Sequence, residues 1–379
     1  MHKPASILIV DDEPFNLDYL EQELQDLHLQ TRRAGNGRQA LTAVAAEPPD
    51  LLLLDIMMPE MDGFEVLAHL KGQETLRDIP VIVISAVDDA DSIAKGIRMG
   101  AEDYLPKPFD ALLLRARISA CLERKRLRDQ ELLHLRRINE ELAWAWEVQS
   151  GFLPAPLPDI PGWQFAAHLK PSRETSGDFF DLISLADGRL GILVADVSDK
   201  GMGAALFMVL SRTLIRLHAA QAHQPAAVLG AANRHILNDI HTNQFVTVFY
   251  GILDPLTGSL VYSSAGHTPA YIVPDTRGEP VLALRRTGMP LGVLYEQDWE
   301  QESVELPRGD LLFVYTDGLT DAQNEQAEFF GATRLLNVLG AHAGEPTPDI
   351  QDAVLRCLEE FTGGAPQSDD ITLVIASRR

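Results

Sequence analysis

Five polar residues in the first third of the chain stand where short apolar runs end or nearby: Asp11, Asp12, Asp55, Ser85 and Lys107. The three carboxylates could bind Mg²⁺, a hard cation that prefers oxygen ligands, or they could simply cap strands and helices. The Ser85 hydroxyl and the Lys107 ammonium favour the interpretation as a Mg²⁺ site. A carboxylate nucleophile, a divalent cation, a hydroxyl and an ammonium together suit phosphoryl transfer to an aspartate, because the transition-state charge spreads over three oxygens.

A second set of carboxylates occupies the C-terminal half, in four short motifs that also contain glycine or a second aspartate. The central residues of these motifs are Asp178, Asp196, Asp317 and Asp369. Asp-Gly pairs usually mark turns, so any one of these motifs is more often structural than catalytic. Four together favour a metal site, and carboxylates without a Cys or convergent His motif select Mg²⁺ or Mn²⁺ over zinc. A two-metal carboxylate site suits hydrolysis of phosphate esters.

Three apolar runs predict the strands that position the first set of polar residues. They lie at residues 7–10, 51–54 and 81–84, with amphipathic stretches between them. Uninterrupted apolar runs of this length are typical of parallel strands covered on both faces. We therefore predict a doubly wound α/β domain over residues 1–120. In such sheets ligands bind beyond the carboxyl ends of the strands, which is where the polar residues fall.

A long helix is predicted over residues 112–152, because no Gly or Pro occurs there before Gly151. A heptad pattern can be placed on it, with an asparagine, Asn139, at an a position, as in parallel dimers. The alternative is a single helix that packs on its own domain. The a positions are Ile118, Lys125, Leu132, Asn139 and Trp146, and the d positions are Cys121, Arg128, Leu135, Leu142 and Gln149.

Repeated prolines between residues 153 and 161 end that helix and indicate a domain boundary. We take residues 121–152 as a helical, possibly coiled-coil linker and residues 153–379 as the second domain. Strand-like segments there alternate with helical stretches, which predicts an α+β domain with a large antiparallel component. The strands are expected at 190–194, 245–253, 260–263 and 311–315, and the helices at 202–219, 225–240, 331–342 and 347–361.

Composition excludes several classes of protein. No apolar run approaches the roughly 18 residues that span a bilayer, and the N-terminus lacks a secretory apolar region, so we expect a cytoplasmic protein. The formal charge of −23 argues against binding nucleic acid, and no helix-turn-helix stretch supports a DNA-binding regulator. Cys121 and Cys357 have no metal-type spacing, and we expect both to be buried apolar residues.

Residues 1–120 resemble the response-regulator receiver domain in the acidic pair, the segment around Asp55, Ser85-Ala86 and Lys107-Pro108. The resemblance implies that a sensor histidine kinase or phosphotransfer protein phosphorylates Asp55. It implies that Mg²⁺ is held by Asp12, Asp55 and the Met57 carbonyl, with Asp11 assisting. It also implies that Ser85 and Tyr104 move as a switch pair and that Lys107, before a cis bond to Pro108, pairs with the phosphoryl group.

Residues 146–377 resemble a PP2C-type phosphatase domain of the branch that includes sporulation and stress-response regulators. The resemblance rests on the entry segment Trp146 to Pro154, the four aspartate motifs, Ala265-Gly266-His267-Thr268-Pro269 and Gly288-Met289-Pro290-Leu291-Gly292. It implies an α/β/β/α sandwich with two Mn²⁺ or Mg²⁺ ions. The implied ligands are Asp178, Asp196, Asp317, Asp369 and the Val197 carbonyl, with Asp181 and Asp370 as second-tier candidates.

Three further residues have weaker interpretations. His267 could act as a general acid, but a loop histidine next to Thr-Pro is more often structural, and water could protonate the leaving group. Lys200 and Arg173 could attract a phosphorylated substrate.

The two resemblances together predict a response regulator whose phosphorylation at Asp55 controls a metal-dependent serine/threonine phosphatase, acting on a phosphorylated anti-sigma-factor antagonist. The alternative is a phosphatase-like adaptor that binds a sigma factor or its regulator without catalysis. Degeneration of such an adaptor should remove the ligand carboxylates first, and here all four are present. A parallel homodimer would hold two output domains side by side.

Overall fold

The structure is a computed structural model that describes residues 4–86, 90–108, 110–239, 243–276 and 278–379, without the side chains of Ser85, Ala86, Ala90 and Ser92. The chain divides into two compact units, Met1–Arg137 and Ile138–Arg379. Each unit has its own hydrophobic core, so each is described by itself.

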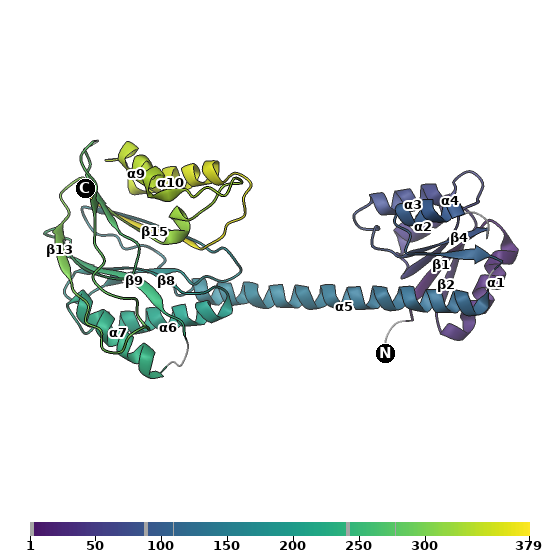
Figure 1. Cartoon of the computed structure of the whole chain (residues 1–379), viewed down its shortest axis with the longest axis horizontal. Coiled ribbons are helices and arrows are strands. Elements are labelled where there is room, and N and C mark those ends of the chain that lie inside the picture. The colour runs from purple at the N-terminus through teal and green to yellow at the C-terminus, as the bar shows by residue number, and fades with distance from the viewer. Residues whose placement is uncertain (1–3, 87–89, 109, 240–242, 277) are drawn as a thin grey trace. The chain divides into compact units, whose positions relative to one another are not determined.

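The first unit is a five-stranded parallel sheet in the order β2-β1-β3-β4-β5 (Figure 1). Alternate residues of each strand enter two separate cores, as the pleat of a buried strand requires: Leu8 and Val10 face one core, Ile7 and Ile9 the other. The predicted doubly wound fold is confirmed. The strands are β1 Ser6–Val10, β2 Gln30–Ala34, β3 Leu51–Asp55, β4 Val81–Ala86 and β5 Asp103–Lys107. The helices that precede α5 are α1 Pro14–Leu24, α2 Gly37–Ala46, α3 Gly63–Gly72 and α4 Ala90–Arg98, with a 3-10 turn at Gln25–Leu27.

Helix α3 starts very close to the end of β3. A Cβ atom on Gly63 would lie 2.2 Å from the Asp55 carbonyl oxygen, so only glycine fits at this position. Asp62 and Glu65 form a capping box that satisfies the backbone at the start of the helix. The Asp-Gly pair after β3 therefore fixes the loop beside Asp55.

Helix α5 runs from Ala111 to Ser150, close to the predicted limits. Its first turns belong to the core of the first unit, because Ile118 and Cys121 are fully buried there. Gln149, at its other end, is buried in the second unit. These three heptad positions are therefore unavailable to a dimer seam, which limits the predicted pattern to Lys125 through Trp146.

The second unit contains two antiparallel five-stranded sheets, in the orders β13-β10-β9-β8-β7 and β12-β11-β14-β15-β6. One core lies between the sheets, where Phe249 and Tyr262 meet Leu312 and Val314. The strands are β6 Trp163–Lys170, β7 Phe179–Ser184, β8 Leu190–Val197, β9 Val246–Leu253, β10 Ser259–Ala265, β11 Tyr271–Val273, β12 Leu282–Ala283, β13 Glu302–Glu305, β14 Leu311–Tyr315 and β15 Ile371–Arg378.

Helices cover the outer face of each sheet, which confirms the predicted α/β/β/α sandwich (Figure 1). Helices α6 Met202–Ala219 and α7 Pro225–Asp239 pack on the first sheet, and α9 Gly331–Ala341 and α10 Thr347–Thr362 on the second. A short helix, α8 Asp317–Thr320, follows β14. Among the described residues α6 is the one helix long and apolar enough to suit a membrane span, and 44% of it is buried inside the unit. Its buried side chains belong to the core beneath the sheet.

Both cysteines are free. Cys121 is buried, as expected, whereas Cys357 on α10 is only partly buried.

Candidate functional site

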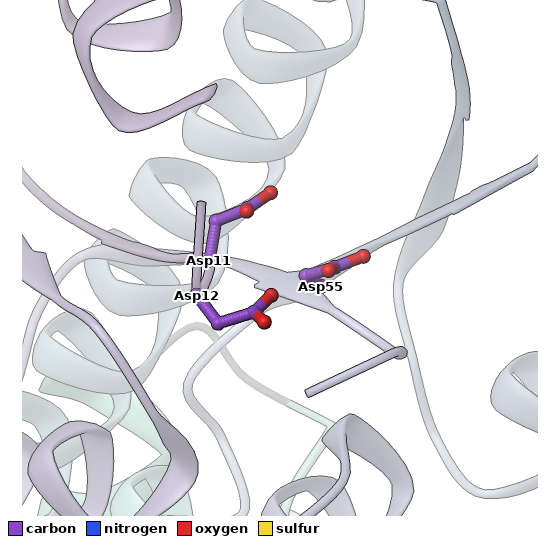
Figure 2. A group of neighbouring side chains, drawn as sticks. All are labelled: Asp11, Asp12 and Asp55. Carbon is purple, nitrogen blue, oxygen red and sulfur yellow. The ribbon is translucent and has the colours of Figure 1, made fainter. Parts of the chain in front are cut away.

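The first carboxylate group lies at the carboxyl edge of the parallel sheet. Asp11 and Asp12 directly follow β1, and Asp55 ends β3 (Figure 2). One carboxylate oxygen from each lies within 4.8 Å of the others, with Asp11 and Asp55 buried and Asp12 exposed. Oxygen-only donors at this spacing fit a small, hard divalent cation such as Mg²⁺.

Lys107, at the end of β5, places its Nζ 3.0 Å from both Asp11 Oδ2 and Asp55 Oδ1. Burial raises the pKa of Asp55 although the bond from Lys107 opposes that shift. Burial would lower the pKa of Lys107, but its bonds to the two carboxylates raise it overall. The ammonium is therefore held charged beside the Asp55 carboxylate, a position suited to binding a phosphoryl group.

The other predicted receiver residues lie on β4, on β5 or in the segments that follow β3 and β5. The Lys107-Pro108 bond is cis, as the resemblance implied. Tyr104 lies on β5, and the guanidinium carbon of Arg117 from α5 is 4.8 Å from the centre of its ring. Ser85, the last but one residue of β4, pairs with Pro106 of β5, but its side chain lies outside the described residues. Met57 follows β3, and its side chain is exposed. The role predicted for this residue, binding Mg²⁺, belongs to its backbone carbonyl.

The second carboxylate group lies in the sandwich domain and begins with Asp178, just before β7. Its carboxylate is buried, and its Oδ2 accepts hydrogen bonds from Thr316 Oγ1 at 2.6 Å and Thr372 Oγ1 at 2.7 Å. Burial raises the pKa of Asp178 well above its usual range, and the neighbouring Asp196 adds to this shift. The two threonines belong to the ends of β14 and β15, so both strands fix this one carboxylate.

Asp196 on β8 and Asp317 at the start of α8 line one small cavity. Burial raises the pKa of Asp196 to about 7, and the charges of Asp317 and Asp369 contribute. Burial and Asp369 likewise raise the pKa of Asp317. Carboxylates that oppose one another's ionisation in this way are stabilised by a cation placed between them. The donor set therefore fits divalent cations.

The loops that carry Asp317 and Asp369 approach each other closely. A Cβ atom on Gly318 would lie 2.0 Å from the Asp370 carbonyl oxygen, which excludes any larger residue. Asp369 Oδ1 is 2.8 Å from Lys200 Nζ. Lys200 therefore neutralises a predicted ligand, and it is less available to a substrate than the sequence suggested. Arg173 is exposed and makes no ion pair with any described residue.

The structure assigns the two second-tier candidates to structural roles. Asp181 is fully buried on β7 and pairs with Arg216 at 2.7 Å and Arg212 at 2.8 Å, both on α6. Both oxygens of Asp370 accept hydrogen bonds from the segment before β7: Oδ1 from the Ser172 backbone and hydroxyl, and Oδ2 from Ser176 Oγ and the Gly177 N–H. Their charges are compensated by protein groups, so we exclude both from the proposed ligand set.

His267 lies in the same small cavity but is buried, with its Nδ1 2.9 Å from Thr247 Oγ1. Burial lowers the pKa of His267 to about 3, so the ring is neutral near pH 7. A neutral, fixed imidazole is a poor general acid. This geometry favours the structural interpretation of the residue.

Sequence reasoning missed Gln149, near the end of α5. Its Nε2 donates to the Ser176 carbonyl at 2.6 Å, and its Oε1 accepts from the Ser176 N–H at 3.1 Å. Ser176 lies two residues before Asp178. The sequence marked Gln149 only as a heptad d position and as part of the segment Trp146 to Pro154, and its role could not be predicted because its partner is a backbone 27 residues away. Thr316 and Thr372 did stand inside the quoted motifs, beside the aspartates.

Comparisons with known proteins match both halves. Residues 7–119 match the family described as response regulator receiver domain, and residues 186–379 match the family described as Stage II sporulation protein E (SpoIIE). Protein IcfG of Synechocystis is 33% identical over 265 residues, which are 63% of this chain and 41% of IcfG. The phosphoserine phosphatase RsbU of Bacillus subtilis is 26% identical over 246 residues, 64% of this chain and 71% of RsbU.

A solved structure described as the SiaA-PP2C domain of Pseudomonas aeruginosa superposes with a TM-score of 0.57 at 26% identity. The match covers 65% of this chain and 98% of that domain. The chain thus spans less than half the length of IcfG but nearly all of the solved phosphatase domain.

Proposed function

Because the chain belongs to the SpoIIE family and has a receiver domain before its PP2C-type phosphatase domain, we propose that it is a two-component response regulator whose phosphorylation at Asp55 controls a metal-dependent serine/threonine phosphatase. The observation that carries the proposal is that each domain brings carboxylates together: three within 4.8 Å of one another in the first, and in the second Asp178, Asp196, Asp317 and Asp369, whose charges act on one another. The proposed location is the cytoplasm.

At the first site Asp55 is the proposed phosphate acceptor from a sensor histidine kinase or phosphotransfer protein. Its Oδ1 would attack phosphorus while Lys107, already 3.0 Å away, binds the phosphoryl oxygens. Asp11, Asp12, Asp55 and the Met57 carbonyl would hold Mg²⁺. We propose that Ser85 and Tyr104 respond to the new phosphate.

At the second site Asp178, Asp196, Asp317 and Asp369, with the Val197 carbonyl, would hold two Mn²⁺ or Mg²⁺ ions. When bound, the ions would neutralise the carboxylates and lower the pKa of the attacking water. Thr316 and Thr372 orient Asp178, and Asp370 fixes the loop that precedes it. These hydrogen bonds preorganise the site before substrate arrives.

The proposed substrate is a phosphoserine or phosphothreonine of a protein, namely an anti-sigma-factor antagonist. RsbU, the relative of which this chain covers 71%, is described as a phosphoserine phosphatase, which supports this class of substrate.

Regulation is proposed to travel along α5. This helix begins in the core of the receiver domain and ends at Gln149, which binds both backbone groups of Ser176. A change in the position of the helix end would therefore reach the loop that carries Asp178. Exposed apolar residues on α5, such as Leu132 and Leu135, support a parallel homodimer, which sedimentation velocity would test.

The test is Mn²⁺-dependent hydrolysis of a phosphoserine peptide by the full chain, with and without beryllofluoride to mimic the phosphorylated receiver. We expect Asp317→Asn to lower kcat by at least about 100-fold, because several kcal/mol of transition-state stabilisation depend on the bound ions. Asp187→Asn, in an exposed hairpin turn, is the matched control. Asp55→Asn should abolish the response to beryllofluoride. Full activity of Asp317→Asn would refute the assignment of the metal site.

A further inference from the structure

A small cavity of about 50 Å³ opens beside the predicted metal ligands of the phosphatase domain. Its lining includes the carboxylates Asp196 and Asp317 together with Arg286, His267 and Thr268. A single water needs about 10–15 Å³ by this measure, so the cavity has room for about three to five water-sized groups. The three non-bridging oxygens of a phosphoryl group are a set of that size.

Arg286 brings to this cavity a positive charge that no carboxylate of the described residues pairs with. Its Nε donates to the His267 carbonyl at 2.8 Å, and within the described part of the chain it forms no ion pair. The neighbouring Arg285 is different, because it pairs with Glu300 and Glu302 on the surface. Lys200, the cation nearest Asp369, is also paired. In Arg286, unlike Arg285 and Lys200, the terminal guanidinium nitrogens keep N–H groups that can donate to a ligand.

The backbone that holds Arg286 is itself fixed. The His267 ring is buried and forms a hydrogen bond with Thr247. Thr268 Oγ1 donates to the carbonyl of Tyr315, two residues before Asp317, at 2.6 Å. The bond to Nε therefore orients the guanidinium plane from a rigid loop. A planar guanidinium with two free nitrogens binds phosphate in a bidentate manner, and little side-chain entropy remains to be lost on binding.

We propose that Arg286 is a catalytic residue that binds the phosphoryl group of the substrate, and afterwards the inorganic phosphate product, in the cavity between its guanidinium and the carboxylates Asp196 and Asp317. The inference rests on the proposed phosphatase function and names the site where its substrate is held. The backbone carbonyl at position 267 positions the arginine.

The experiment compares the full chain with Arg286→Ala, Arg286→Lys and the matched control Arg285→Ala, using an aryl phosphate with Mn²⁺. We expect kcat/KM of Arg286→Ala to fall about 100-fold and the inhibition constant of inorganic phosphate to rise about tenfold, because one preorganised donor pair is lost. Arg286→Lys should recover part of both effects. Arg285→Ala should stay within about twofold of the wild type, since exposed ion pairs contribute little.

Two further measurements separate binding of phosphate from general damage. The Mn²⁺ concentration that gives half-maximal activity should be the same in Arg286→Ala and wild type, and the melting temperatures should agree. Equal kcat/KM and equal phosphate inhibition in Arg286→Ala and Arg285→Ala would overturn the proposal.

If the wild type hydrolyses no phosphate ester, the proposed function fails, yet the site can still be judged by calorimetric titration of inorganic phosphate into the Mn²⁺-treated chain. Binding that is lost in Arg286→Ala would support the site, and binding that is equal in both proteins would refute it.

Discussion

In the receiver domain one ammonium lies 3.0 Å from two of the three clustered carboxylates, whereas in the phosphatase domain the charged groups that act most on buried Asp178 and Asp196 are other carboxylates. The lysine of the second site, Lys200, pairs with the predicted ligand Asp369, whose side chain is 40% exposed. The first site is therefore partly neutralised by the protein, and the second is left for cations to neutralise. Similar aspartate motifs can therefore be partly neutralised by a lysine of the protein, as in the first site, or depend on bound metal ions, as in the second.

The largest expected effect comes from replacing the lysine of each site, Lys107 or Lys200, with alanine. Lys107→Ala should slow phosphorylation of Asp55 by a small-molecule phosphodonor about 100-fold, because a preorganised donor to the phosphoryl oxygens is removed. Lys200→Ala should change peptide hydrolysis less than about fivefold, since a partly exposed ion pair contributes about 0–1 kcal/mol. The rate of Asp55 phosphorylation measures the first effect, and the rate of phosphate release from the peptide measures the second. Similar losses in both variants would break the comparison.

A smaller effect is expected at the connection between α5 and the second site. Gln149→Ala would leave the buried Ser176 N–H without a partner, which costs about 1–3 kcal/mol in local stability. We expect kcat to fall about tenfold and the response to beryllofluoride to shrink, because the loop before Asp178 loses its anchor. Gln130→Ala, on an exposed part of the same helix, is the control. A normal response in Gln149→Ala would exclude this route.

The smallest effect concerns stability against pH in metal-free protein. The pKa of Asp196 is about 7 in the folded chain against 3.8 as its ordinary value, so between these limits the folded state binds more protons than the unfolded state. Stability of the phosphatase domain should therefore fall as pH rises from 4 to 7, and Tm should drop by about 2–4 °C for each kcal/mol lost.

Mn²⁺ should restore Tm more at pH 7.5 than at pH 5, because it binds the ionised carboxylates. Melting curves of wild type and Asp196→Asn measure this difference, and the variant should show a shallower pH slope. An equal slope in both proteins would mean that other groups carry the effect.

Local patterns sufficed to predict much of the fold. The apolar runs at 7–10, 51–54 and 81–84 became β1, β3 and β4, and the helix predicted at 202–219 is α6. The aspartate motifs were also recognisable, since turns and strand ends have local signatures. The heptad was misjudged at its ends, because Ile118 and Cys121 satisfy a helical period equally well inside a domain core.

Partners distant in sequence could not be predicted. Asp181 resembles a ligand until Arg212 and Arg216 of α6 are brought against it, 31 and 35 positions later. Arg286 and its acceptor, the His267 carbonyl, are likewise joined only by the folded loop. Such pairings depend on tertiary packing, which short-range periodicity does not record.

The two threonine hydroxyls on Asp178 have a consequence for ion selectivity. Since both donate to Oδ2, that oxygen is occupied and the carboxylate can offer a cation mainly Oδ1. A one-oxygen ligand suits the octahedral shells of Mg²⁺ and Mn²⁺, whereas Ca²⁺ takes six to eight oxygens and often chelates both atoms of a carboxylate. Thr316 and Thr372 would thus discriminate against calcium, which competition between Mn²⁺ and Ca²⁺ in the hydrolysis assay would reveal.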